Sequence, residues 1–181
     1  MAMQIEKTFQ VKEPIDTVWN LLSDPRRVAN CVPGAKITEQ VDEKTYEGTI
    51  TVKVGPSTTD YKGKLEIVRL DAENHEIEIL GKGQDMKGRG SASMRMTGKA
   101  RSLDEGGTEV TSVSEVNVVG MLAQMGSRVI AEVSNIIFAQ FTRNFQAQLQ
   151  QPADAETPEA KPISAASVAW AAAKGAFHRD T

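Results

Sequence analysis

Few side chains in this sequence are placed to carry out acid–base or nucleophilic chemistry. The chain has two histidines: His75, expected in a turn between strands, and His178, close to the C-terminus. A Ser-His-Asp or Cys-His arrangement needs a histidine held in a cleft beside its nucleophile, and neither position favours that. The one cysteine, Cys31, is interpreted as a small buried residue rather than a nucleophile.

Metal and nucleotide sites are not indicated either. Cysteine and histidine form no cluster with metal-ligand spacing. The segment starting at Gly81 begins like a dinucleotide-binding fingerprint, but Met86 stands in place of the third glycine and the segment lies between two strands. Glutamates on the predicted strands fall mostly in the outward register, with Glu115 unsettled. We therefore expect no catalytic residue, no metal and no covalently bound cofactor.

Small and flexible apolar residues are more informative. Small residues are predicted on the inward face of two neighbouring strands: Gly81, Gly83, Gly88, Gly90, Ala92 and Gly98. The methionines Met86, Met94, Met96, Met121 and Met125 suit an irregular pocket as well as an ordinary core. A sheet that packs on a long helix must fill the space between them, so small residues there predict room for a hydrophobic ligand.

The elements that would position these residues are strands and helices in a simple order. Residue alternation predicts a first strand at about 3–11, and Pro14 and Pro25 suit the first turns of two short helices. Further strands are predicted at 35–41, 46–54, around 61–67, around 77–79, 88–99 and 108–119, with a turn at Gly106-Gly107. The last strand has a disturbed alternation that a bulge would explain.

The period of apolar residues becomes helical from Met121 onward. One broad apolar face is formed by Leu122, Met125, Val129, Val133, Ile136 or Ile137, Phe141, Phe145 and Leu149. A continuous helix to Gln150 would be roughly 40 Å long at about 1.5 Å per residue, enough to cross a whole sheet.

The length and composition predict one domain at residues 1–150, a flexible linker at 151–162 and an amphipathic tail at 163–181. In that tail Ile163, Trp170 and Phe177 are spaced to share a helix face toward a membrane or a partner protein. The net charge of −3 and the dispersed basic residues argue against nucleic-acid binding. We find neither a membrane-spanning apolar run nor a signal peptide, which favours a cytoplasmic location.

This order of elements resembles the helix-grip fold of the START/Bet v 1-like (SRPBCC) superfamily. The motifs resemble more narrowly the CoxG family, named for a subunit of carbon monoxide dehydrogenase, over about residues 3–149: Asp24-Pro25, Cys31 to Ala35, Val52 to Pro56, Tyr61 to Gly63, Gly81 to Asp85, Gly107-Thr108 and, most strongly, Val118 to Gly126. The resemblance implies an α+β fold in which a curved antiparallel sheet of about seven strands wraps around a long C-terminal helix, with two short helices after the first strand.

The resemblance also implies a non-catalytic accessory protein, peripheral to the inner face of the cell membrane, that links a molybdenum hydroxylase of the carbon monoxide dehydrogenase type to that membrane. A quinone or similar lipid would occupy an apolar cavity, lined by Tyr61, Ile79, Met94, Met96, Met125, Val129 and Val133. The candidate entrance comprises Cys31, Val32, Pro33, Gly120 and Met121. A ligand-free assembly factor or adaptor, and a small cyclase-like enzyme of the same superfamily, stay open as alternatives.

Overall fold

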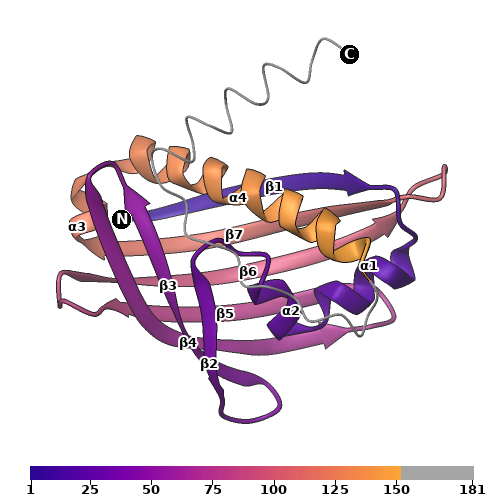
Figure 1. Ribbon diagram of the computed structural model, residues 1–181, viewed down its shortest axis with the longest axis horizontal. Helices are drawn as coiled ribbons and strands as arrows, with labels where there is room; N and C mark the ends of the chain where they lie inside the picture. The colour runs from indigo at the N-terminus through magenta and orange to yellow at the C-terminus, as the bar shows by residue number, and fades with distance from the viewer. Residues whose placement is uncertain (152–181) are drawn as a thin grey trace.

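The computed structural model describes residues 1–151, in which a seven-stranded antiparallel sheet curves around a long helix (Figure 1). Its elements are β1 (Ala2–Val11), α1 (Ile15–Leu22), α2 (Pro25–Ala29), β2 (Ala35–Gln40), β3 (Thr45–Val54), β4 (Ser57–Asp71), β5 (Glu76–Asp85), β6 (Gly90–Ser102), β7 (Thr108–Gly120), α3 (Met121–Gln124) and α4 (Ser127–Leu149). The predicted helix-grip fold is confirmed. The tail, with Ile163, Trp170 and Phe177, lies outside the described residues.

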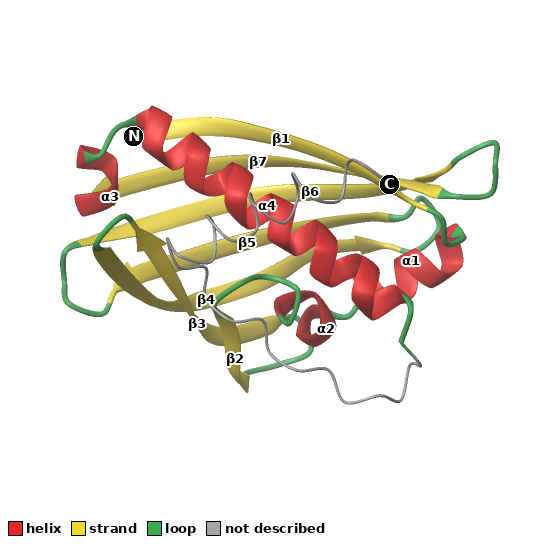
Figure 2. Cartoon of the chain, turned by 45° about the horizontal axis from the view of Figure 1, so that its top comes forward, coloured by secondary structure: helices red, strands yellow, loops and turns green. Residues whose placement is uncertain are grey.

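The strands follow the order β1-β7-β6-β5-β4-β3-β2, so only β1 pairs with a strand distant in the sequence. Figure 2 shows α4 lying along the concave face, with α1 and α2 near its C-terminal end. Because side chains alternate between the faces of a strand, the concave face receives odd-numbered residues of β1 and β5 and even-numbered residues of β3, β6 and β7.

A row of glycines allows the sheet to bend sharply. Gly48 pairs with Gly63 across β3 and β4, and Gly63 pairs with Gly83 across β4 and β5. A Cβ atom on Gly63 would collide with the backbone of Lys82 and Gly83, so only glycine permits this approach of two strands. In Figure 1, β2 and β3 turn across the end of the sheet at this place.

The two short helices begin as the sequence predicts. Pro14 is the N-cap of α1, and Pro25 occupies the first turn of α2. The Asp24 side chain accepts hydrogen bonds from the backbone N–H groups of Arg26 (3.1 Å) and Arg27 (3.4 Å). These bonds satisfy donors that have no partner inside the helix, and they fix the direction in which α2 leaves α1.

The prediction of one continuous helix from Met121 is wrong. The turn α3 ends at Gln124, and Gly126 adopts φ +92° before α4 begins at Ser127. A left-handed residue interrupts a helix at little cost when it is glycine. α4 itself has 23 residues, about 35 Å at 1.5 Å per residue. Met125 is therefore the C-cap of α3 and does not belong to the long helix.

Of the small residues predicted on the inward face, Gly88 lies elsewhere and Gly90 leaves no space. Gly88 is in the β5–β6 turn with φ +74°, because β5 already ends at Asp85. Gly90 does begin β6, but a Cβ there would collide with the backbone carbonyl of Val119. Gly81, Gly83, Ala92 and Gly98 lie in the inward register, as predicted.

The bulge predicted in the last strand is also absent. β7 pairs continuously with β1 and β6, and its apolar residues are divided between both faces: Val110, Val116 and Val118 point inward, whereas Val113 and Val119 point outward. This register places Glu115 on the exposed outer face, opposite Arg95. The alternation is therefore disturbed because β7, which lies between β1 and β6 in the sheet, also carries apolar residues on its outer face.

The buried core forms two clusters that meet at α1. The first contains Val11, Val18, Leu21, Cys31, Ala100, Val110 and Phe145, and the second contains Trp19, Tyr46, Ile67, Ile77 and Ile79. Leu22 packs against both clusters. Consequently α1 holds the sheet and the C-terminal part of α4 together at one end of the molecule.

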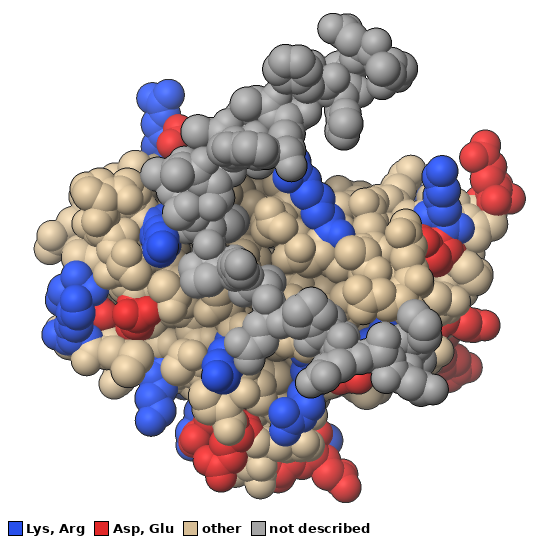
Figure 3. Space-filling view, in the orientation of Figure 1, with Lys and Arg blue, Asp and Glu red and all other residues tan. Residues whose placement is uncertain are grey.

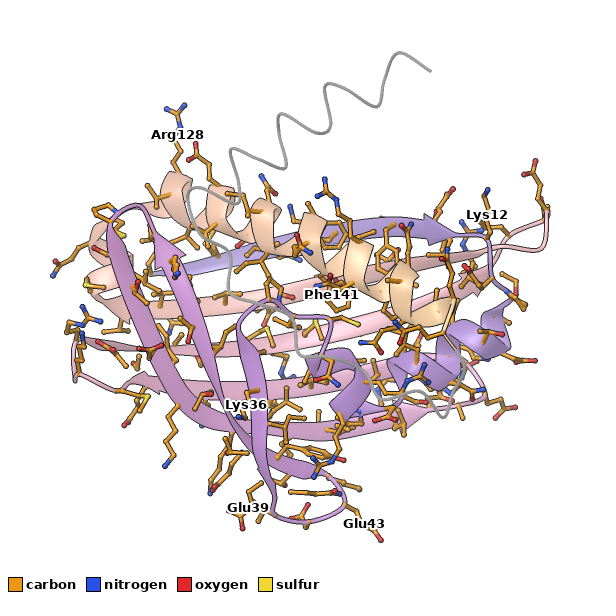
Figure 4. All side chains as sticks on the ribbon, viewed as in Figure 1. Lys12, Lys36, Glu39, Glu43, Arg128 and Phe141 are labelled. Carbon is orange, nitrogen blue, oxygen red and sulfur yellow. The ribbon has the colours of Figure 1, made fainter. Side chains whose placement is uncertain are left out.

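Aromatic contacts attach α4 to the edge of the sheet. The Phe9 ring of β1 lies edge-on to three rings of α4, with centroid distances of 5.9 Å to Phe138, 6.2 Å to Phe141 and 5.3 Å to Phe145. Figure 4 shows Phe141 between α4 and the sheet. Edge-to-face pairs add to the free energy of burial. Phe145 is fully buried, whereas Phe138 and Phe141 are half-buried.

We expect Phe145→Ala to lower the free energy of unfolding by about 3–5 kcal/mol, because it leaves a cavity where α4 meets both β1 and α1. Phe138→Ala, on the same helix but half-buried, should cost distinctly less. Urea unfolding followed by circular dichroism measures both. Equal losses for the two variants would contradict the packing described here.

Candidate functional site

The two ends of α4 are packed very differently. Near the C-terminus, Phe145 and Gln148 are buried, and they are the fully buried residues of this helix. Toward the N-terminus every apolar residue is only half-buried: Val129, Ile130, Val133, Ile136 and Ile137. Nothing in this half of α4 enters either buried core cluster. The helix is thus fixed to the sheet at one end, and its other half presents a partly exposed apolar surface.

The sheet beneath this half of α4 is also apolar and incompletely covered. Half-buried side chains on the concave face include Ile50, Val52, Leu65, Met94, Met96 and Val116. Leu65 and Met96 border the second core cluster, whereas Met94 belongs to neither cluster. Two half-buried apolar surfaces therefore face the same space, an arrangement that fits an apolar ligand.

The residues predicted to line a ligand site divide into two groups. Ile79 and Met96 pair across β5 and β6 and are part of, or packed against, the second core cluster. Met94, Met125, Val129 and Val133 are half-buried and outside both clusters, and Tyr61 is buried at 7% exposure. The structure brings Tyr61 and Met94 onto one concave face. Whether these residues bind a ligand stays a prediction.

Gly81 and Gly83 differ from Gly63 in what a side chain at the position would contact. A Cβ on Gly81 would lie 3.7 Å from Met94 Cε, and one on Gly83 would lie 3.6 Å from Tyr61 Cβ. These are ordinary contacts with side chains on the concave face, so the missing methyl groups leave room above the sheet. The predicted space is best supported at these two positions.

The predicted entrance residues are held by different parts of the fold. Cys31 and Pro33 are buried, and Val32 is half-buried. Asn144 of α4 donates a hydrogen bond to the Cys31 carbonyl (2.9 Å), and Gln148 donates one to the Arg27 carbonyl (3.1 Å). This loop therefore lies beside the C-terminal part of α4, whereas Gly120 and Met121 precede its N-terminal end. Their role as an entrance stays a prediction.

The Cys31 thiol is not a reactive group in this fold. Burial raises its pKa to about 12, although the positive charge of Arg27 lowers the pKa somewhat. The thiol is therefore protonated at neutral pH and behaves as a small apolar group. This agrees with the interpretation of Cys31 as a packing residue.

The sequence analysis did not predict the ion pair at the β5–β6 turn. Asp85 is on the concave side of β5 with a side-chain exposure of 1%, and its Oδ2 lies 2.7 Å from Arg89 Nε. The same carboxylate accepts hydrogen bonds from the backbone N–H groups of Lys87 (3.3 Å) and Arg89 (3.0 Å). The Arg89 hydrogen bond is the main cause that lowers the Asp85 pKa. Its signal in the sequence is the four-residue spacing of an acid and a base around Gly88.

A second polar contact joins the helix to β1. Lys7, the one polar residue in the inward register of β1, donates a hydrogen bond to the Asn135 side chain of α4, and its ammonium lies 5.7 Å from the Phe138 ring centroid. A cation over an aromatic face is favourable. This explains why a lysine occupies an otherwise apolar register.

The described residues supply one histidine and no metal site. Within residues 1–151, no group of His, Cys, Asp and Glu is close enough to hold a metal ion. His75 lies in the β4–β5 turn, and its ring packs edge-on to Trp19 at 5.4 Å. In the same part of the chain, no helix combines the length and apolar character needed to cross a bilayer.

Comparison with known proteins supports a family. The sequence model of the CoxG family, whose description names it as a subunit of carbon monoxide dehydrogenase, matches residues 8–150. Among curated proteins, none matches this sequence.

Solved structures share the fold at low identity. A conserved protein from Geobacillus kaustophilus is 19% identical with a TM-score of 0.74, covering 81% of this chain and 95% of its own. The Zhui aromatase/cyclase from Streptomyces sp. R1128 is 15% identical (TM-score 0.61, 83% and 94% covered). A START superfamily protein from Mycobacterium smegmatis is 12% identical (TM-score 0.56, 82% and 97% covered). At these identities the likeness shows the fold alone.

Asp85 should make stability depend on pH. Its pKa is lowered in the folded protein, so its stabilising contribution is present above the ordinary pKa of about 4 and is lost as the pH falls through the lowered value. Asp85→Asn should be less stable than the parent at neutral pH, with a gap that closes on acidification. Urea midpoints across this pH range test this.

The matched control is Asp104→Asn, which alters an exposed carboxylate in the β6–β7 turn. Its stability difference from the parent should be small and nearly constant. If the difference in unfolding free energy between the parent and Asp85→Asn stayed constant down to a pH of about 3, the ion pair would not stabilise the fold.

Proposed function

This chain belongs to the CoxG family of carbon monoxide dehydrogenase, and we propose that it is a non-catalytic accessory protein that binds a hydrophobic ligand between α4 and the sheet. The ligand is a quinone or a similar lipid, and the protein links a molybdenum hydroxylase of the carbon monoxide dehydrogenase type to the membrane. The family match supports the accessory role, and the uneven packing of α4 supports ligand binding.

The observation that carries this proposal is the pair of half-buried apolar surfaces. Val129 and Val133 on α4, and Met94 on the concave face of β6, are apolar side chains that stay partly exposed. A folded protein normally buries such residues, because each gains about 1.5–3 kcal/mol from full burial. An apolar ligand would complete that burial without any new protein contact.

The chemistry of the surface selects an apolar chain over a charged molecule. The Asp85 carboxylate on the concave side is already neutralised by Arg89, and Lys7 is bonded to Asn135. A hydrocarbon chain gains about 0.8 kcal/mol for each buried CH₂ group, so several such groups suffice for binding without an ionic anchor.

A basic surface on the outer face supports the membrane link. Four exposed lysines near the β5–β6 turn have no ion pair among the described residues: Lys53, Lys62, Lys82 and Lys87. In addition, Lys82 lies directly opposite Lys64 in the β4–β5 ladder, and Lys64 itself forms an ion pair with Glu47 at 3.6 Å. We name Lys53, Lys62, Lys82 and Lys87 the lysine surface.

Much of the rest of the outer face is neutralised by pairing. Arg69, Arg95 and Lys99 form ion pairs with Glu76 or Glu78. Seen from the helix side, acidic groups gather at the β2–β3 hairpin and at the end opposite α3 (Figure 3). The lysine surface lies around the β5–β6 turn, at the α3 end of the sheet (Figure 1), together with Met86 at 62% exposure. Lysines beside an exposed apolar side chain suit a bilayer with anionic lipid.

Ala92→Phe should block ligand binding, because Ala92 lies on the concave face next to Gly83. Ser93→Phe is the matched control, since it places the same ring on the outer face of the same strand. Titration with decylubiquinone should show at least a tenfold loss of affinity for the first variant and little change for the second.

Mass spectrometry of an organic extract from the purified full-length protein tests the same proposal without mutation. A co-purified quinone or lipid that Ala92→Phe lacks would support it. If the parent carries and binds no apolar ligand, the ligand-binding function is wrong, and a ligand-free adaptor becomes the favoured alternative.

The lysine surface should bind anionic vesicles in a salt-dependent way. Lys62→Gln with Lys82→Gln should lower the partition coefficient on vesicles containing phosphatidylglycerol by about 30-fold, from about 1 kcal/mol per lysine. The control pair Lys12→Gln with Lys44→Gln removes the same charge from exposed positions elsewhere; Figure 4 shows Lys12 at the end opposite α3. Equal losses for both pairs would argue that net charge, rather than this surface, controls binding.

A further inference from the structure

Within residues 1–151, two hydroxyl groups on the concave face of β4 have no hydrogen-bond partner. Thr59 and Tyr61 are two residues apart and therefore point to the same face, with exposures of 1% and 7%. The Thr59 Oγ1 atom is buried without a hydrogen-bond partner. Within the described residues the Tyr61 hydroxyl also makes no hydrogen bond. A buried hydroxyl without a partner, such as that of Thr59, is uncommon, because it loses its hydration without compensation. The Tyr61 oxygen is itself not fully buried, so it is open to a ligand.

The nearest strong acceptor is already occupied. Asp85 pairs with Tyr61 in the β4–β5 ladder, but its carboxylate receives the Arg89 side chain and the backbone N–H groups of Lys87 and Arg89. The same turn is bonded to the residues on both sides of Thr59: Arg89 donates to the Thr58 carbonyl and Met86 to the Asp60 carbonyl. The Asp85–Arg89 ion pair thus lies at this end of the concave face, and its carboxylate accepts no hydrogen bond from the Thr59 or Tyr61 hydroxyl.

Tyr61 is positioned and protonated to act as a donor. A Cβ on Gly83 would lie 3.8 Å from Tyr61 Cδ1, so the ring lies over the position where a side chain is missing. Burial, and then the Asp85 charge, raise the pKa of Tyr61 above its usual value. The phenol therefore keeps its proton at neutral pH. The surrounding concave face supplies half-buried apolar groups such as Met94 and Val52.

We propose that Tyr61, supported by Thr59, donates a hydrogen bond to a carbonyl oxygen on the head of the bound ligand. The ligand is thereby an apolar chain with an uncharged carbonyl-bearing head, and its head lies at the Asp85–Arg89 end of the concave face. This inference rests on the proposed function, since it names the polar contact within the same ligand site. The Asp85–Arg89 pair positions the site and does not itself touch the ligand.

Two probes with the same chain test this contact in the full-length protein. Decylubiquinone has carbonyl groups in its head, whereas decylbenzene has the same alkyl chain and no oxygen. Tyr61→Phe should weaken decylubiquinone binding about fivefold, the effect of one neutral hydrogen bond, and leave decylbenzene binding unchanged. Tyr46→Phe is the matched control, because Tyr46 is equally buried but packs in the second core cluster. It should change neither affinity.

Infrared spectra of bound decylubiquinone supply a readout that packing alone would not move. A hydrogen-bonded carbonyl band lies at lower frequency, so the parent should show such a band and Tyr61→Phe should lose it. Thr59→Val, which keeps the side-chain shape, provides a second variant. It should weaken the binding of decylubiquinone and leave the binding of decylbenzene unchanged.

The outcomes separate the two proposals. If both probes bind and Tyr61→Phe, Thr59→Val and the infrared band show no selective effect, the hydrogen bond is wrong while ligand binding stands. If the parent binds neither probe, the proposed function fails, and the inference fails with it. A selective loss for decylubiquinone alone supports the inference.

Discussion

The arrangement of this protein depends on the contact between Phe9 of β1 and the phenylalanine rings of α4. These rings, with Val18 and Leu21 of α1, bury the C-terminal part of the helix. The N-terminal part follows Gly126, whose left-handed backbone lets the chain change direction after α3. A helix that is fixed at its C-terminal end and preceded by a glycine break can lie over the sheet without filling the space between them. The uneven burial of α4 is a direct consequence.

Much of the fold could be predicted from local patterns. Period-two alternation located the strands, and prolines at helix starts located α1 and α2, because these signals arise from neighbouring residues. The inward register of Gly81, Gly83 and Ala92 was likewise predictable. The family resemblance implied that the sheet wraps around the long helix, which periodicity alone does not supply.

The errors arose where local patterns are ambiguous. An apolar helical period continues through Gly126, although the backbone there is left-handed, so periodicity could not reveal the break. Gly63 and Gly81 look alike in the sequence, yet one permits strands to approach and the other leaves space beside Met94. The partners of Asp85 and Lys7 depend on the folded geometry. The sequence therefore predicted the apolar concave face as the candidate site, but it did not predict the Asp85–Arg89 ion pair at one end of that face.

The central claim is that an apolar ligand lies between the N-terminal half of α4 and the sheet. The methionines are natural probes, because Met94 and Met96 lie on the concave face and Met86 is exposed on the β5–β6 turn. With methyl-labelled methionine, nuclear Overhauser effects from bound decylubiquinone should reach the Met94 and Met96 methyl groups and not Met86. Effects confined to Met86 would place the ligand on the surface and contradict the account.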